Sequence, residues 1–131
     1  MKTCAEGRQG IDRLAQMIFV ALPLEEIDKA DWKVWVAFLG YSIGRERLVQ
    51  EHRKRYDFLR QIICQELADL QTVKLIRADL DLTLEANALI ALVDGIGIGV
   101  VICPEQFSAD QQQYLVPTYQ CFTAIILNTD A

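Results

Sequence analysis

The chain has 131 residues, which is long enough to bury one hydrophobic core without disulfides or a metal. We therefore expect a single domain over residues 1–131. With 52% hydrophobic and 24% charged residues, the composition is that of a soluble globular protein. The formal net charge of −5 argues against sequence-independent binding of nucleic acid, which requires clustered lysine and arginine. All 13 basic residues lie within residues 1–77, so the C-terminal part is acidic and strongly apolar.

The spacing of apolar residues predicts an all-α fold, a single helical bundle of about five principal helices. The three- and four-residue steps place these helices at residues 10–21, 28–43, 45–71, 82–103 and 108–127. We expect Asp81 to cap the fourth helix and Ser108 to open a capping box at the start of the fifth. Pro117 should kink the fifth helix or delay its start.

The last two predicted helices carry almost no charge, which a small monomer cannot easily bury. We predict that they form a four-helix interface with the same helices of a second copy. Gly95, Gly97 and Gly99 would let backbones approach closely. In the alternative interpretations these glycines only loosen the helix, or residues 92–103 form a buried strand. The residues predicted at the dimer interface are Leu92, Gly95, Ile96, Gly99, Val100, Tyr119, Phe122 and Ile126.

Membrane insertion and bound cofactors are not expected. The apolar run 86–104 approaches spanning length, but Asp94 at its centre and the lack of flanking bases argue against a membrane helix. The polar first ten residues lead us to expect no signal peptide. Four scattered cysteines and a single histidine suit neither a metal site nor a disulfide framework, so we expect reduced thiols in the cytoplasm. The glycine run 95–99 does not match a dinucleotide-binding loop, because Val100 stands where the G-x-G-x-x-G pattern requires its third glycine.

Aromatic and polar residues of the second, third and fourth predicted helices suggest a ligand pocket. The aromatic residues form either core or the wall of an apolar-ligand cavity, and His52 is either a core residue or a polar handle in that cavity. Asn87 and Asp94 share one helical face, so they pair structurally or line the pocket. The residues predicted to bind the ligand are Trp35, Phe38, His52, Tyr56, Leu59, Asn87, Ile90 and Asp94, with Asp94 as a polar anchor.

Basic residues gather on the predicted long helix. The run from Glu51 to Arg55 mixes positive and negative charges, which is typical of a solvated helix face. Contact of these bases with anionic groups is the alternative interpretation.

Three segments resemble the C-terminal domain of TetR-family transcriptional repressors, in the branch related to the betaine-pathway regulator. They are Trp-Val-Ala-Phe at residues 35–38, the polar long helix with His52 and Tyr56, and Ala-Leu-Val-Asp-Gly-Ile at residues 91–96. The similarity covers roughly residues 9–128. It implies a homodimer formed through the last two helices and a small apolar or amphipathic effector bound between the earlier ones. Effector binding would then shift two DNA-reading heads and release an operator.

Family members begin with a helix-turn-helix segment, and nothing like it precedes Gly10 in this sequence. We therefore expect no direct DNA binding by this chain alone. The sequence thus predicts a regulatory sensor domain with no catalytic residues, cofactor or metal. Two alternatives stay open: a helical-bundle adaptor for another protein, and a small enzyme that uses His52 with an acid such as Asp94.

Overall fold

The computed structural model describes residues 16, 18–19 and 21–122, with side chains up to residue 115. Its elements are α2 (Glu26–Ser42), α3 (Glu46–Thr72), α4 (Leu82–Ile102), the short 3-10 helix η1 (Pro104–Gln106) and α5 (Ala109–Phe122). This order confirms the predicted all-α fold. Most of the helix predicted at residues 10–21 lies outside the described residues, although residues 16, 18, 19 and 21 are helical.

Local sequence signals set the ends of these helices. Gly44 lies between α2 and α3 with φ of +82°, a conformation that glycine adopts without a steric penalty. The Asp81 carboxylate accepts hydrogen bonds from the backbone N–H groups of Thr83 and Leu84, which caps α4 as predicted.

The predicted capping box also forms at the start of α5. The Gln111 N–H donates to the Ser108 hydroxyl at 3.2 Å, and the Ser108 N–H donates to the Gln111 side chain at 2.7 Å. Because α5 begins at Ala109 and continues past Pro117, the late start offered as one alternative is wrong.

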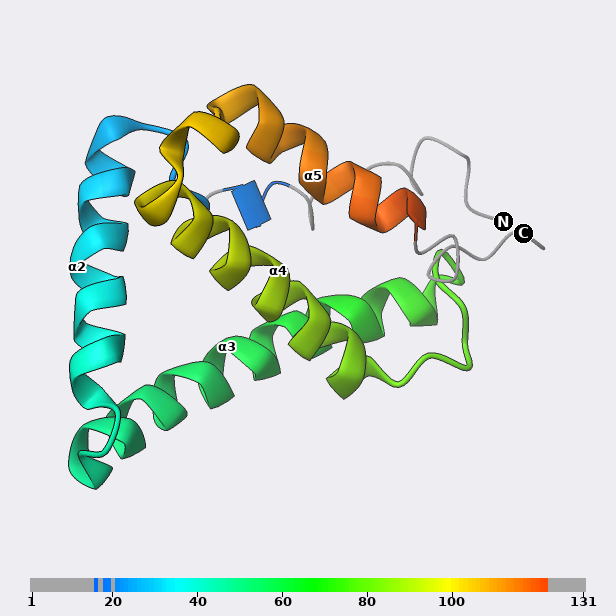
Figure 1. Ribbon diagram of the computed structural model, residues 1–131. Helices are drawn as coiled ribbons and strands as arrows, with labels where there is room; N and C mark the ends of the chain where they lie inside the picture. Colours follow the sequence, from blue (N-terminus) through cyan, green and yellow to red (C-terminus); the bar gives the residue numbers. More distant parts are fainter. Residues whose placement is uncertain (1–15, 17, 20, 123–131) are drawn as a thin grey trace.

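Helix α4 is the centre of the fold and packs against both α2 and α3. In Figure 1, α2 and α3 meet at a corner, and α4 runs from the far half of α3 to the far end of α2. The core includes Leu67 and Ile76 beside Ala86, Ile96 and Val100 of α4, each at most 3% exposed. This burial explains why α4 is apolar on more than one face.

Contacts within the chain explain why glycine is needed at two positions of α4. A Cβ at Gly97 would overlap the indole ring of Trp32, and a Cβ at Gly99 would overlap the ring of Phe107. A Cβ at Gly95 would meet nothing within 4 Å, and this glycine is exposed. Two of the three glycines thus receive rings of their own chain. The alternative of a buried strand at residues 92–103 is wrong, since α4 is helical up to Ile102.

The residues predicted at the dimer interface fall on different faces of α4. Ile96 and Val100 are buried by the chain itself, and Leu92 is half-buried against the core. Gly99 lies under Phe107, whereas Gly95 lies on the outer face. Of the predicted residues of α4, only Gly95 is exposed in the single chain, and the role of this set at an interface stays a prediction.

The remaining predicted interface residues belong to the fifth helix. Tyr119 and Phe122 lie in the part of α5 for which the backbone alone is described, and Ile126 lies outside the described residues. Their role stays a prediction.

Candidate functional site

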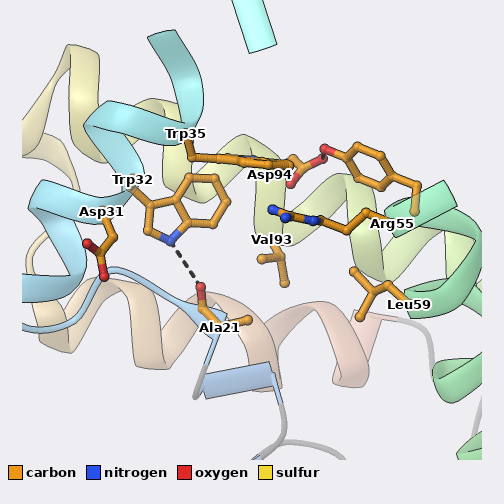
Figure 2. A pocket seen from close by; sticks show the side chains of 9 residues that line it. Ala21, Asp31, Trp32, Trp35, Arg55, Leu59, Val93 and Asp94 are labelled. Carbon is orange, nitrogen blue, oxygen red and sulfur yellow. Dashed lines mark hydrogen bonds between the residues drawn. The ribbon is translucent and has the colours of Figure 1, made fainter. Parts of the chain in front are cut away.

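An open pocket of about 250 Å³ lies between α2, α3 and α4 (Figure 2). This volume has room for several water molecules. It is below the range of about 300–1,000 Å³ typical of drug-sized ligands, so the pocket suits a small molecule. We call it the aromatic pocket. Its lining residues are Ala21, Asp31, Trp32, Trp35, Arg55, Tyr56, Leu59, Val93 and Asp94.

Trp32 is fixed in the wall of the aromatic pocket by two contacts. Its indole Nε1–H donates to the carbonyl oxygen of Ala21 at 3.0 Å, a bond drawn in Figure 2. Its ring covers Gly97, where any side chain would displace it. The position of this wall therefore depends on a glycine of α4.

Trp35, one helical turn after Trp32, forms the second aromatic wall. Its ring lies 6.4 Å from that of Tyr56, and the edge of His52 packs against it at 4.9 Å. The Arg55 guanidinium lies over the Trp35 ring, 4.9 Å from its centroid. This is a cation–π geometry, so the Trp35 face already accommodates a positive charge.

The Tyr56 hydroxyl donates a hydrogen bond to the Asp94 carboxylate at 2.8 Å, which joins α3 to α4 beside the pocket. Burial, and then the Asp94 hydrogen bond and charge, raise the pKa of Tyr56, so the phenol keeps its proton. Burial also raises the pKa of Asp94, while the Tyr56 hydrogen bond acts in the opposite direction. Ionised Asp94 is therefore a partly desolvated negative charge.

Asp94 has no ion-pair partner among the residues that the structure describes. Arg60, one turn after Tyr56 on α3, donates to Asn87 at 2.6 Å and pairs with Asp57 at 2.6 Å. Asp31 and Asp94 thus give the lining two acids, against the single base Arg55. This balance favours a ligand with a positively charged group.

Four of the residues predicted to bind a ligand line the aromatic pocket: Trp35, Tyr56, Leu59 and Asp94. Phe38 and His52 line a neighbouring depression instead, and Phe38 packs 4.9 Å from the His52 ring. His52 is 7% exposed, and its Nε2 has no hydrogen-bond partner among the described residues.

The other two predicted residues lie away from the pocket. Asn87 is exposed on α4 and bonds to Arg60, while Ile90 is a core residue at 8% exposure. Both share a helical face with Asp94 by spacing, but the aromatic pocket covers only one turn of that face.

Sequence reasoning missed Ala21, Asp31, Trp32, Arg55 and Val93. Trp32 carried a usable signal, since it precedes Trp35 by three residues and so lies on the same helical face. Arg55 looked like part of a solvated charged run, and nothing in its spacing indicated that it turns toward Trp35. No group of three or more His, Cys, Asp or Glu side chains suitable for a metal ion occurs in the described part of the chain.

The described chain is thus a helical bundle with an open, aromatic-lined pocket between α2, α3 and α4. Residues 10–119 match the family of BetI-type transcriptional repressor C-terminal domains, and the chain belongs to this family. This confirms the TetR-type resemblance seen in the sequence.

A solved structure with the same fold is that of a transcriptional regulator from Saccharomonospora viridis in complex with choline. It has a TM-score of 0.78 and 24% sequence identity over 90% of this chain. The chain spans 60% of that regulator's length. No curated relative matches the chain by sequence.

Helix α4 is long and apolar enough to cross a membrane by length and composition alone, and 33% of its most apolar window is buried inside the chain. Such a helix is also typical of the core of a soluble protein. Three observations favour the assignment of α4 as a core helix. It packs against α2 and α3, and its Asp94 accepts a hydrogen bond from Tyr56. The chain also belongs to a family of transcriptional regulators.

Proposed function

We propose that this chain is the effector-sensing and dimerisation domain of a TetR-type transcriptional repressor. In this proposal the aromatic pocket binds a small molecule that carries a cationic ammonium group. The observation that carries it is the half-buried Asp94 carboxylate, which lacks a basic partner among the described residues and lies beside the indole rings of Trp32 and Trp35.

The chemistry of the aromatic pocket suits an alkylated ammonium. Such a cation is attracted to the face of an aromatic ring, most strongly to tryptophan, by about 0.5–2 kcal/mol. Its positive charge would offset the cost of keeping Asp94 ionised in a partly desolvated site. The volume of about 250 Å³ is sufficient for a small ammonium compound. The choline bound to the Saccharomonospora viridis regulator supports the same class of effector.

The proposed dimer uses the outer face of α4. Leu84, Ile98 and Ile102 are 63%, 43% and 68% exposed, and the small residues Ala91 and Gly95 lie between them on the same face. Exposed apolar side chains flanking small ones allow two helices to pack closely across a two-fold axis. We therefore propose that a second copy of this chain covers this face. The alternative, in which the chain is an adaptor, would place a different protein there.

Regulation would follow from the position of the pocket. The aromatic pocket joins α2 and α3 to α4, the helix that carries the proposed dimer face. An effector that binds one arrangement of these helices more tightly than another shifts the equilibrium between them. DNA-binding heads attached to such a dimer would change their spacing. The proposal gives the chain no catalytic role.

The experiment that tests this function is isothermal titration calorimetry with choline and Asp94→Asn. We expect wild-type protein to bind choline with a one-to-one stoichiometry per chain. Asp94→Asn should bind at least about tenfold more weakly, which corresponds to roughly 1.4 kcal/mol, because it removes the charge and keeps the hydrogen bond from Tyr56.

The matched control is Asp57→Asn, which removes an exposed carboxylate of α3 outside the pocket. Its affinity for choline should remain within about twofold of wild type, since solvent and salt largely screen an exposed carboxylate that does not line the pocket. Equal losses in both variants would assign the effect to overall charge and contradict the proposed site.

A further inference from the structure

Arg55 is the one basic side chain in the lining of the aromatic pocket. It reaches from α3 across the pocket toward Trp32, as Figure 2 shows. Its guanidinium lies over the Trp35 ring and forms no ion pair with any carboxylate in the described part of the chain. A cation placed beside an acidic site without pairing with it has an unused capacity to bind an anion.

A simple cation would meet two opposing groups in this pocket. Asp94 and the indole faces attract it, while Arg55 occupies the Trp35 face and repels it. Arg55 is exposed, so water screens part of this repulsion, but a bound cation and the guanidinium would still compete for the same ring face. A simple cation would therefore have to displace Arg55 toward the solvent.

A zwitterion meets no such conflict. Its ammonium group would lie against Asp94 and the indole rings, and its carboxylate would pair with the Arg55 guanidinium in a bidentate geometry. The ligand adds no net charge, and each of these two charged side chains finds an opposite charge.

Resting on the proposed function, we propose that the preferred effector of the aromatic pocket is a small zwitterion with an alkylated ammonium and a carboxylate, and that Arg55 determines this specificity. The chemical class follows from one guanidinium and one carboxylate that line the same aromatic pocket and form no ion pair with each other.

The test compares choline with trimethylglycine, which have the same trimethylammonium group and differ in an alcohol or a carboxylate. Isothermal titration calorimetry measures the ratio of their dissociation constants. We expect wild-type protein to bind trimethylglycine about tenfold more tightly. Arg55→Gln should bind choline more tightly than wild type and trimethylglycine more weakly, which reverses the preference.

Lys54→Gln is the control variant, since Lys54 is the neighbouring base, pairs with Glu51 and does not line the aromatic pocket. It should keep the wild-type ratio. Circular dichroism melting checks that each variant is folded, and Arg55→Lys should retain the zwitterion preference in part if Arg55→Gln is unstable.

The outcomes separate this inference from the proposed function. Choline binding that depends on Asp94, with a ligand ratio unchanged by Arg55→Gln and Arg55→Lys, would overturn the zwitterion proposal alone. A wild-type preference for choline would do the same. Failure of folded wild-type protein to bind either ligand would overturn the proposed cationic effector, and this inference with it.

Discussion

Asp94 is the residue at which stability and binding make opposite demands. Burial raises the pKa of its carboxyl above the value in the unfolded chain. The carboxyl therefore binds a proton more tightly in the folded state than in the unfolded state. The stabilisation that comes with protonation is fully present below the unfolded pKa of about 3.9 and is lost as pH rises through the higher folded value. At neutral pH the native state therefore keeps a carboxylate that weakens its own fold.

Asp94→Asn should consequently stabilise the ligand-free domain at pH 7 while it weakens effector binding. The amide removes the desolvated charge, and its oxygen still accepts the Tyr56 hydroxyl. We expect thermal melting at a temperature up to a few degrees higher than wild type, with the difference shrinking as pH falls toward 4. A variant that melts at a lower temperature across this range would contradict the role given to Asp94.

Single residues of the pocket were only partly predictable from the sequence. Trp35 and Tyr56 could be predicted because aromatics at helical spacing on facing helices tend to converge. Asp94 stood out as the single acid of an apolar run. Arg55 could not be predicted, since a long side chain in an exposed charged run reaches solvent or a neighbouring ring with little difference in local pattern.

At the scale of the element, α4 holds one face for the core and another for solvent. Its ends were predicted to within one residue, because Asp81 and Pro104 are strong local signals. Which face of α4 points outward was not predictable from the sequence. Apolar residues lie on all sides of this helix, so their spacing does not distinguish a buried face from an exposed one. The contacts of Gly97 with Trp32 and of Gly99 with Phe107 decide the orientation.

Gly97→Ala should disturb the aromatic pocket through α4. The added methyl group would overlap the Trp32 ring, which must move and lose its bond to Ala21. We expect a loss of about 1–3 kcal/mol in the free energy of unfolding and weaker choline binding. Chemical denaturation and calorimetry measure the two effects.

Gly95→Ala is the matched change on the open face of the same helix. Nothing lies within 4 Å of the added methyl group, and alanine is a better helix former by about 1 kcal/mol. The monomer should therefore gain stability or stay unchanged. Equal destabilisation by both substitutions would contradict the role given to the contact between Gly97 and Trp32, since helix propensity favours alanine at both positions.

At the scale of the whole molecule, the exposed stripe of α4 predicts self-association. Ile98→Glu would place two carboxylates against each other across the proposed two-fold axis, where desolvation makes repulsion costly. We expect sedimentation velocity at micromolar concentration to show a dimer for wild type and a monomer for Ile98→Glu.

The control for this prediction is Val34→Glu, which adds the same charge at a 71% exposed position of α2. It should remain a dimer. A monomeric wild-type chain would contradict the proposed interface and favour the adaptor alternative. A dimer that persists in Ile98→Glu would mean that another face of the domain associates.

The central claim is that the aromatic pocket is an effector site. Ligand binding there can be followed through side chains that are already part of the pocket. Its two tryptophans, Trp32 and Trp35, both line the pocket. The most direct measurement is therefore a titration of ¹⁵N-labelled protein with choline or trimethylglycine, followed through the two indole N–H resonances. We predict that both resonances shift and saturate together. Two resonances that stay unchanged at millimolar concentrations of either ligand would contradict the claim.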